Sequence, residues 1–250
     1  MPKFNIKISQ GFTLIEMAIV LIILGLVLSS LLIPIRAQRD LQAQRQTEET
    51  LARAKQALLG YAQTFGRLPC PATALTNGNE APIGGGTCTA ISGFLPAATL
   101  GIQPIDNNGF AIDGWNLPIR YAVTPATNGG SASPDFTTAA EISDIGPATL
   151  QPNLRVCRSG AGVTALTCSG AIPETNFLTN NAVAVVFSLG LTGNLAAGGV
   201  DELENTTGSN VFVSHDVTQA GAPNGEFDHL VTWISPFELY HGMIAAGQLR

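Results

Sequence analysis

The sequence lacks the short motifs that mark common catalytic sites. It contains no G-x-S-x-G, no H-E-x-x-H, no P-loop and no G-x-G-x-x-G between a strand and a helix. The three histidines, His215, His229 and His241, are spaced too widely to resemble the close pairs of zinc sites. We expect ordinary histidines, and a metal site assembled from distant segments is the less favoured alternative. The sequence therefore offers no catalytic residue.

Charged residues are scarce, at 12% of the chain, whereas glycine occurs 27 times. This composition favours a loop-rich extracellular β structure over a cytosolic enzyme. Residues 1–67 hold eight Lys or Arg and four Asp or Glu, a net charge of +4, whereas residues 68–250 hold four and fourteen, a net charge of −10. Phosphate binding needs a basic surface, so the acidic larger part argues against a nucleic-acid partner.

Cysteine is limited to four residues, and no two of them form a C-x-x-C pair. An even number without that motif predicts two disulfides in an oxidising compartment. Four cysteines allow three connectivities. Because a long stretch separates Cys88 from Cys157, two local loops are the simpler choice, and we expect the pairs Cys70–Cys88 and Cys157–Cys168.

One long apolar run begins after Gly11 and continues through Ile33, interrupted chiefly by Glu16. A helix needs roughly 20 such residues to cross a bilayer core of about 30 Å, so residues 12–34 predict a transmembrane helix. Basic residues flank the run on both sides and leave its orientation nearly balanced. The cysteines all follow the run, so we expect a cytoplasmic amino terminus and a periplasmic or external bulk.

The stretch Gly11-Phe12-Thr13-Leu14-Ile15-Glu16 follows a short basic leader and opens this apolar helix. It closely resembles the processing site of the type IV pilin and type II secretion pseudopilin superfamily, and the resemblance extends to about residue 66. The resemblance implies a leader peptide of residues 1–11, cleavage after Gly11 by a prepilin peptidase, and methylation of the new Phe12 amine. It also implies that Glu16 faces the Phe12 amine of a neighbouring subunit.

Two plainer explanations of the amino terminus are less favoured. An ordinary secretory signal peptide would have an apolar region of about 7–15 residues followed by a small-x-small cleavage site. The apolar run here is longer, and Ile35-Arg36-Ala37 fits such a site poorly. An uncleaved plain membrane anchor is the other alternative.

The helical pattern continues beyond Pro34, so we expect residues 35–66 to form an amphipathic helix that carries the globular domain. Its apolar stripe is expected to pack on a sheet, and it comprises Leu51, Ala54, Leu58, Tyr61, Ala62 and Phe65. Gly66 predicts the end of the helix. The expected fold is α+β and pilin-like, with the long helix packed on an antiparallel β-sheet.

Residues 67–250 are expected to form a loop-rich β domain, in which residues 67–117 make a long ordered loop. Apolar, β-branched segments bounded by turn residues predict short antiparallel strands at 119–124, 154–158, 182–189, 211–217 and 230–234. Ser235, Pro236 and Glu238 predict a capping box that starts a short carboxy-terminal helix. Its apolar face is expected to contain Phe237, Tyr240 and Ile244, with Met243 beside them.

The segment Asp113-Gly114-Trp115-Asn116 resembles the Asp-x-Trp-Gly-x-x-Tyr turn that opens the sheet in many pseudopilins. Asn116 stands where that family usually has glycine. We interpret Trp115 as a structural anchor rather than a binding platform.

Two acidic segments are weak candidates for calcium, which accepts six to eight oxygen ligands in irregular loops. One runs from Asp106 to Asp113, and the other contains Asp201, Glu202 and Glu204. Neither matches the calcium loop of major pseudopilins, so solvated turns are the favoured interpretation and no cofactor is expected.

The sequence as a whole favours a structural subunit over an enzyme: a minor pilin or minor pseudopilin of a type IV pilus or type II secretion pseudopilus. Its expected partners are the prepilin peptidase/methyltransferase, other pilins and the inner-membrane assembly machinery. It would begin in the bacterial inner membrane and end in a periplasmic or cell-surface filament. The alternative is a membrane-anchored periplasmic enzyme or ligand-binding module.

Overall fold

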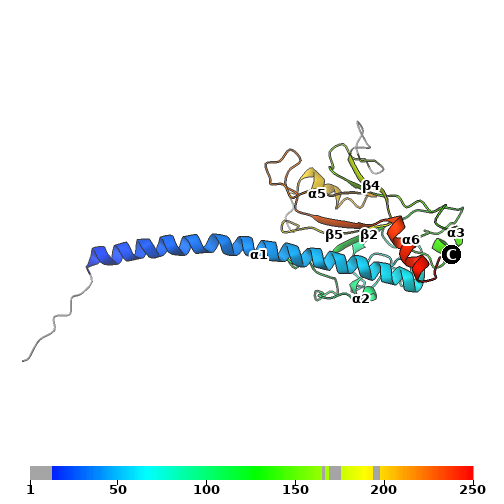
Figure 1. Ribbon diagram of the computed structural model, residues 1–250, viewed down its shortest axis with the longest axis horizontal. Helices are drawn as coiled ribbons and strands as arrows, with labels where there is room; N and C mark the ends of the chain where they lie inside the picture. The colour runs from blue at the N-terminus through cyan, green and yellow to red at the C-terminus, as the bar shows by residue number, and fades with distance from the viewer. Residues whose placement is uncertain (1–12, 165–166, 169–175, 194–197, 250) are drawn as a thin grey trace, which may run out of the picture. The chain divides into compact units, whose positions relative to one another are not determined.

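The computed structural model describes residues 13–164, 167–168, 176–193 and 198–249, with residues 28–37 described by their helical backbone alone (Figure 1). The expected leader, Gly11 and Phe12 lie outside these residues. In chain order the elements are α1 Leu14–Phe65, β1 Ser92–Phe94, α2 Ala97–Leu100, β2 Arg120–Val123, α3 Glu141–Ile145, β3 Leu154–Cys157, β4 Phe177–Ala182, β5 Ala184–Ser188, α5 Val200–Glu204, β6 Val211–Val213, β7 Leu230–Ile234 and α6 Pro236–Ala245.

The chain divides into two compact units, residues 1–42 and residues 43–250, and α1 contributes to both. This boundary lies between the expected ends of the membrane segment and of the amphipathic helix. In the described part of the first unit, the apolar side chains of α1 from Leu14 to Val27 are exposed to different degrees, with Leu14 at 93% and Val27 at 49%. Among the residues that the structure describes, no helix meets the combined length and apolarity of a membrane span.

Within the second unit, α1 supplies one wall of the main hydrophobic core. Leu51, Ala54, Leu58 and Ala62 are buried, at the spacing of three and four that places them on one helix face. Phe65, expected in the same stripe, is instead 55% exposed. Its ring contacts that of Tyr61 at a tilted angle, with centroids 4.4 Å apart, and it lies at the last position of the helix, beyond the buried face.

The first sheet has the strand order β1-β2-β5-β7, and each neighbouring pair is antiparallel. Its two central strands are buried on both faces. Tyr121, Val123, Ala184 and Val186 belong to the core formed with α1, whereas Ala122, Val185 and Phe187 belong to a second core. Because successive strand residues point to opposite faces, this alternation shows that both sides of the sheet are covered.

The second sheet, with the order β4-β3-β6, covers the far face of the first. Leu154 and Val156 of β3 and Phe212 of β6 pack in the second core with Phe187 of β5. The expected antiparallel sheet packed on α1 is confirmed by the first sheet, whereas the second sheet and its parallel β3–β6 pair were not predicted. A parallel pair requires a long connection, and the chain between these strands includes β4, β5 and α5.

The helix α6 begins with the expected capping box. The Ser235 side chain accepts the Glu238 N–H at 3.2 Å, and Glu238 accepts the Ser235 N–H at 3.4 Å. The buried face consists of Pro236, Leu239, Tyr240 and Met243, and α6 contacts α1 through an ion pair of Glu238 with Lys55 at 2.8 Å (Figure 1).

The expected position of Phe237 and Ile244 on the apolar face of α6 is wrong, because these side chains are 79% and 56% exposed. The helical repeat that starts at Pro236 continues at the third, fourth and seventh following residues, and this series contains neither of them.

Both expected disulfides are present, and each closes a local loop. Cys70 and Cys88 have a Cα–Cα distance of 5.4 Å, and Cys157 and Cys168 one of 5.5 Å. Inside the first loop, Arg67 and Glu80 form a buried bidentate ion pair with N–O distances of 2.8 and 2.7 Å. Glu80 also accepts the backbone N–H of Cys70, so this loop has an ordered polar interior.

The Asp113 turn connects the first sheet to α1. Asp113 is 1% exposed; its Oδ1 accepts the N–H groups of Trp115 and Leu117, and its Oδ2 accepts the Ser188 hydroxyl at 2.6 Å. Gly114 donates its N–H to Thr47 Oγ1 on α1 at 2.9 Å. Asn116 has a φ of +64°, which explains why glycine suits this position in the family that the turn resembles.

Candidate functional site

The amino-terminal end of α1 is closed by its own side chains. The Thr13 N–H and hydroxyl each donate to Glu16 Oε2 at 3.3 Å, and Glu16 donates its N–H to Thr13 Oγ1 at 3.3 Å. This reciprocal pattern is a capping box of the form T-x-x-E. It holds a negative carboxylate near the first free N–H groups of the helix, where the helix dipole favours it.

Around and after Glu16, the part of α1 whose side chains the structure describes is apolar on all sides as far as Val27. Its exposed large side chains include Ile15 and Met17, and further along Leu21, Ile22, Leu24 and Leu26. A helix that is apolar around its whole circumference requires burial in lipid or among other helices. The arrangement thus places one polar carboxylate at the beginning of a surface that must be covered.

The calcium candidates on α5 are not brought to one point. Asp201 and Glu202 are 3% and 5% exposed, so the interpretation as solvated turns is wrong for them. Asp201 accepts hydrogen bonds from the segment after β3, Glu202 accepts the Asp228 N–H, and Glu204 accepts the Ser209 hydroxyl. The three carboxylates therefore serve three separate contacts.

The earlier acidic segment forms a turn closed by its own backbone. Asp106 Oδ1 accepts the N–H groups of Asn108 and Phe110 at 2.9 and 2.8 Å. The Asp113 oxygens serve the turn described above, so the two ends of this segment also act separately.

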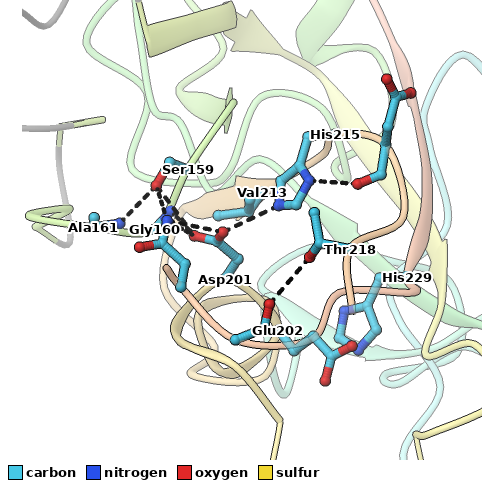
Figure 2. Close-up of polar contacts among 12 residues, drawn as sticks. Ser159, Gly160, Ala161, Asp201, Glu202, Val213, His215, Thr218 and His229 are labelled. Carbon is cyan, nitrogen blue, oxygen red and sulfur yellow. Dashed lines mark hydrogen bonds and ion pairs between the residues drawn. The ribbon is translucent and has the colours of Figure 1, made fainter. Parts of the chain in front are cut away.

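Asp201 is the centre of the polar network in Figure 2. It accepts the Gly160 N–H, the Ser159 hydroxyl at 3.3 Å and the Asn224 amide at 3.1 Å, and it pairs with His215 Nε2 at 3.1 Å. The carboxylate lies between the hydroxyl and the imidazole, whereas nucleophilic catalysis requires the imidazole beside the hydroxyl. The network thus ties the end of β3, α5 and the segment after β6 together.

The three histidines have three different environments. His215 stacks on Phe227 with ring centroids 4.0 Å apart, His229 is 6% exposed, and His241 lies on the exposed side of α6. Burial lowers the pKa of His229 to about 4. The close grouping of His229 with Glu202 and Asp228, whose candidate ligand atoms lie within 4.8 Å of one another, was missed from the sequence. Nothing in the local sequence around α5 indicates that the residues before β7 lie beside it.

A hollow of about 420 Å³ lies within the second unit, between α1 and the segment that joins β6 to β7. Its polar lining includes Glu48, Lys55, His215 and Asp216, and its apolar lining includes Leu51 and Val217. Lys55 is already paired with Glu238 and His215 with Asp201. This hollow is the feature that a ligand-binding module would use.

Comparison with known families assigns the amino-terminal segment. Residues 6–32 match the family model described as the prokaryotic N-terminal methylation motif. The chain therefore carries the amino-terminal signature of type IV pilins and pseudopilins, which confirms the resemblance found in the sequence. No curated protein and no solved structure matches the chain.

Proposed function

We propose that this chain is a pilin-like structural subunit, a minor pilin or minor pseudopilin of a type IV pilus or a type II secretion pseudopilus. The observation that carries the proposal is the methylation motif at residues 6–32, which includes the exposed apolar part of α1 from Leu14 to Val27. The size of the chain and its long loops favour a minor position over the main repeating subunit.

The first stage of the proposed pathway is in the inner membrane. Residues 12–34 insert with the basic leader on the cytoplasmic side, and the domain faces the periplasm. The apolar run in the sequence supports the insertion, and the two disulfides support an oxidising compartment for the domain. The leader, residues 1–11, is removed by the prepilin peptidase, which also methylates Phe12.

The second stage is assembly with other pilins by the inner-membrane machinery. In a filament, lipid is replaced by the apolar helices of neighbouring subunits, and Glu16 becomes enclosed. A buried unpaired charge costs several kcal/mol, so the Phe12 amine of a neighbour is the partner that the carboxylate needs. Methylation leaves that amine cationic. The pair favours one axial register over slipped ones.

Processing is tested by the mass of the amino-terminal peptide. We expect the mature chain to begin at methylated Phe12, and we expect Gly11→Val to leave the full-length precursor in the membrane. Gly25→Ala is the matched control, because a Cβ added at Gly25 meets nothing within 4 Å. Detection of an unprocessed amino terminus in cells with active peptidase would refute the proposal.

The alternative of a membrane-anchored enzyme or ligand-binding module rests on the hollow beside Lys55 and His215. Such a protein would reach its final location without the prepilin peptidase. Deleting the peptidase therefore separates the two functions. The structural subunit would be trapped as a precursor, whereas the anchored module would keep its enzymatic or ligand-binding activity.

A further inference from the structure

Two carboxyl groups are fixed side by side where α5 meets the segment before β7. Glu202 Oε1 accepts the Asp228 N–H at 3.0 Å, and the Thr192 hydroxyl lies 3.5 Å from the same oxygen. Asp228 Oδ2 accepts the Thr192 N–H at 2.8 Å. The backbone of Asp228 and residue Thr192 thus hold both carboxyls in place, with His229 next to them.

The neighbouring His229 is a hydrogen-bond donor at Nε2. Asn205 has a fixed amide orientation, because its Oδ1 accepts the Val213 N–H at 2.7 Å and its Nδ2 donates to the Val213 carbonyl at 3.0 Å. The same Nδ2 lies 3.0 Å from His229 Nδ1, which must accept. A neutral His229 therefore carries its proton on Nε2 and has no lone pair there for a metal ion.

Among the residues with described side chains, no positive charge compensates the two carboxyls. In the part of the chain that the structure describes, neither Glu202 nor Asp228 forms an ion pair with Lys, Arg or His. His229 is neutral at neutral pH, because burial lowers its pKa. Glu226 adds negative charge near Glu202. On α5 itself, Asp201 pairs with His215, and Glu204 accepts the Ser209 hydroxyl.

One buried oxygen of the pair lacks a partner. Asp228 Oδ1 is buried and accepts no hydrogen bond from the described residues. Leaving such an acceptor unsatisfied is costly, and a buried carboxylate resists ionising beside a second, half-buried one. Burial, with a further contribution from the adjacent Asp228 carboxylate, raises the pKa of Glu202 to about 7. A proton on Glu202 would supply the donor that the Asp228 carboxylate lacks.

We propose that Glu202 and Asp228 share one proton in the native fold, and that loss of this proton releases α5 from the segment before β7. The helix α5 is short, and its outward side chains Val200 and Leu203 are 54% and 64% exposed. Apart from the Asp201 contacts with His215 and Asn224, little apolar packing therefore holds α5 when the two carboxylates repel each other. This inference does not depend on the filament function.

The direction of the pH effect follows from linkage. The pKa of Glu202 rises from 4.5 in an unfolded chain to about 7 in the fold, so the folded state holds the proton more strongly. The stabilisation is complete below the unfolded pKa and is lost as the pH rises through about 7. α5 is therefore held most firmly at acidic pH, and its hold weakens between about pH 4.5 and pH 7.

Amide hydrogen exchange in the full-length protein tests the proposal. We expect the protection factors of the α5 amides, which correct for intrinsic exchange, to fall between about pH 4.5 and pH 7 by up to about tenfold per pH unit, and to level off above about pH 7. Glu202→Gln should abolish this fall, since glutamine cannot ionise. Glu204→Gln, on the same helix, is the matched control and should retain it. A fall that persists in Glu202→Gln, or its absence from the unmodified chain, would overturn the proposal.

If Glu202→Gln does not fold, titration of Glu202 in the unmodified protein tests the proposal instead. The carboxyl carbon of Glu202, followed by nuclear magnetic resonance, should titrate near pH 7, and Asp228→Asn should lower that midpoint. An ordinary glutamate midpoint would contradict the shared proton. A saturable response of this resonance to Zn²⁺ or Ca²⁺ would replace the shared proton with a cation site.

Discussion

At the scale of single residues, Glu16 has two separable roles. In the chain itself it completes a capping box with Thr13, an interaction of about 1 kcal/mol for an average cap. In the proposed filament its negative charge pairs with an amine of the next subunit. The first role needs only a hydrogen-bond acceptor, whereas the second needs a charge.

Glutamine and valine at this position distinguish the two roles. Glu16→Gln keeps an acceptor for the cap and removes the charge, whereas Glu16→Val removes both. We expect both variants to insert and be cleaved, and both to lose crosslinking to the other pilins of the cell. Thr13→Ala weakens the cap and keeps the charge, so it should crosslink nearly normally. Normal co-assembly of Glu16→Gln would contradict the charge pair and leave the cap as the role of Glu16.

The sequence predicts the amino-terminal processing motif better than it predicts the contacts made by Glu16 or the Glu202–Asp228 pair. The motif around Gly11 is contiguous, so local sequence suffices to find it. The capping box was not predicted, because Thr13 and Glu16 stand within an apolar run. There the carboxylate is interpreted first as a charge that is costly to place in a membrane. The Glu202–Asp228 pair depends on tertiary structure, since the two residues belong to different elements.

At the scale of elements, the contact between α1 and the Asp113 turn fixes where the helix lies on the sheet. A Cβ built at Gly114 would lie 2.1 Å from the carbonyl oxygen of Ala43, so the turn and the helix backbone touch directly. The hydrogen bond from Gly114 to Thr47 lies at the same point. A larger residue cannot keep this distance.

We expect Gly114→Ala to lower the free energy of unfolding by about 1–3 kcal/mol, the usual cost of overpacking. Asn116→Gly is the matched control in the same turn, because its positive φ suits glycine, and it should change stability by less than about 1 kcal/mol. Urea denaturation of the full-length protein measures both. Equal midpoints for the Gly114→Ala variant and the unmodified chain would show that the turn moves freely away from α1.

Each predicted strand segment contains an observed strand, including β7 with its partly buried side chains, whereas β1 and nearly all of β4 were not predicted. The segment that became β5, Ala-Val-Val-Phe-Ser, is wholly buried and gives a continuous apolar signal. The strand β4 was missed because its Thr-Asn-Asn segment is polar, and pairing with β3 is what holds it. The parallel partner of β3 could not be inferred from any local pattern.

At the scale of the whole molecule, two disulfides act on loops of different character. The Cys70–Cys88 loop is also held by the Arg67–Glu80 ion pair, whereas the Cys157–Cys168 loop begins at the last residue of β3. Each crosslink limits the unfolded chain. The expected stabilisation is about 3 kcal/mol for loops of this size.

Replacing Cys157 and Cys168 together with serine should therefore lower the free energy of unfolding by about 3 kcal/mol, read from the shift of the urea midpoint. Reducing conditions break both disulfides of the unmodified protein, so its midpoint should shift by more than that of the double serine variant. An unchanged midpoint in both would indicate that the unfolded chain is already compact around β3.

The order of layers in the second unit determines which of its surfaces an external binding partner can contact in a filament. The helix α1 covers one face of the first sheet, and the β4-β3-β6 sheet covers the other. If α1 is turned toward a filament axis, the second sheet becomes the outer wall of the assembly. An antibody would then meet β4, including the exposed Asn180, while α1 would stay out of its reach.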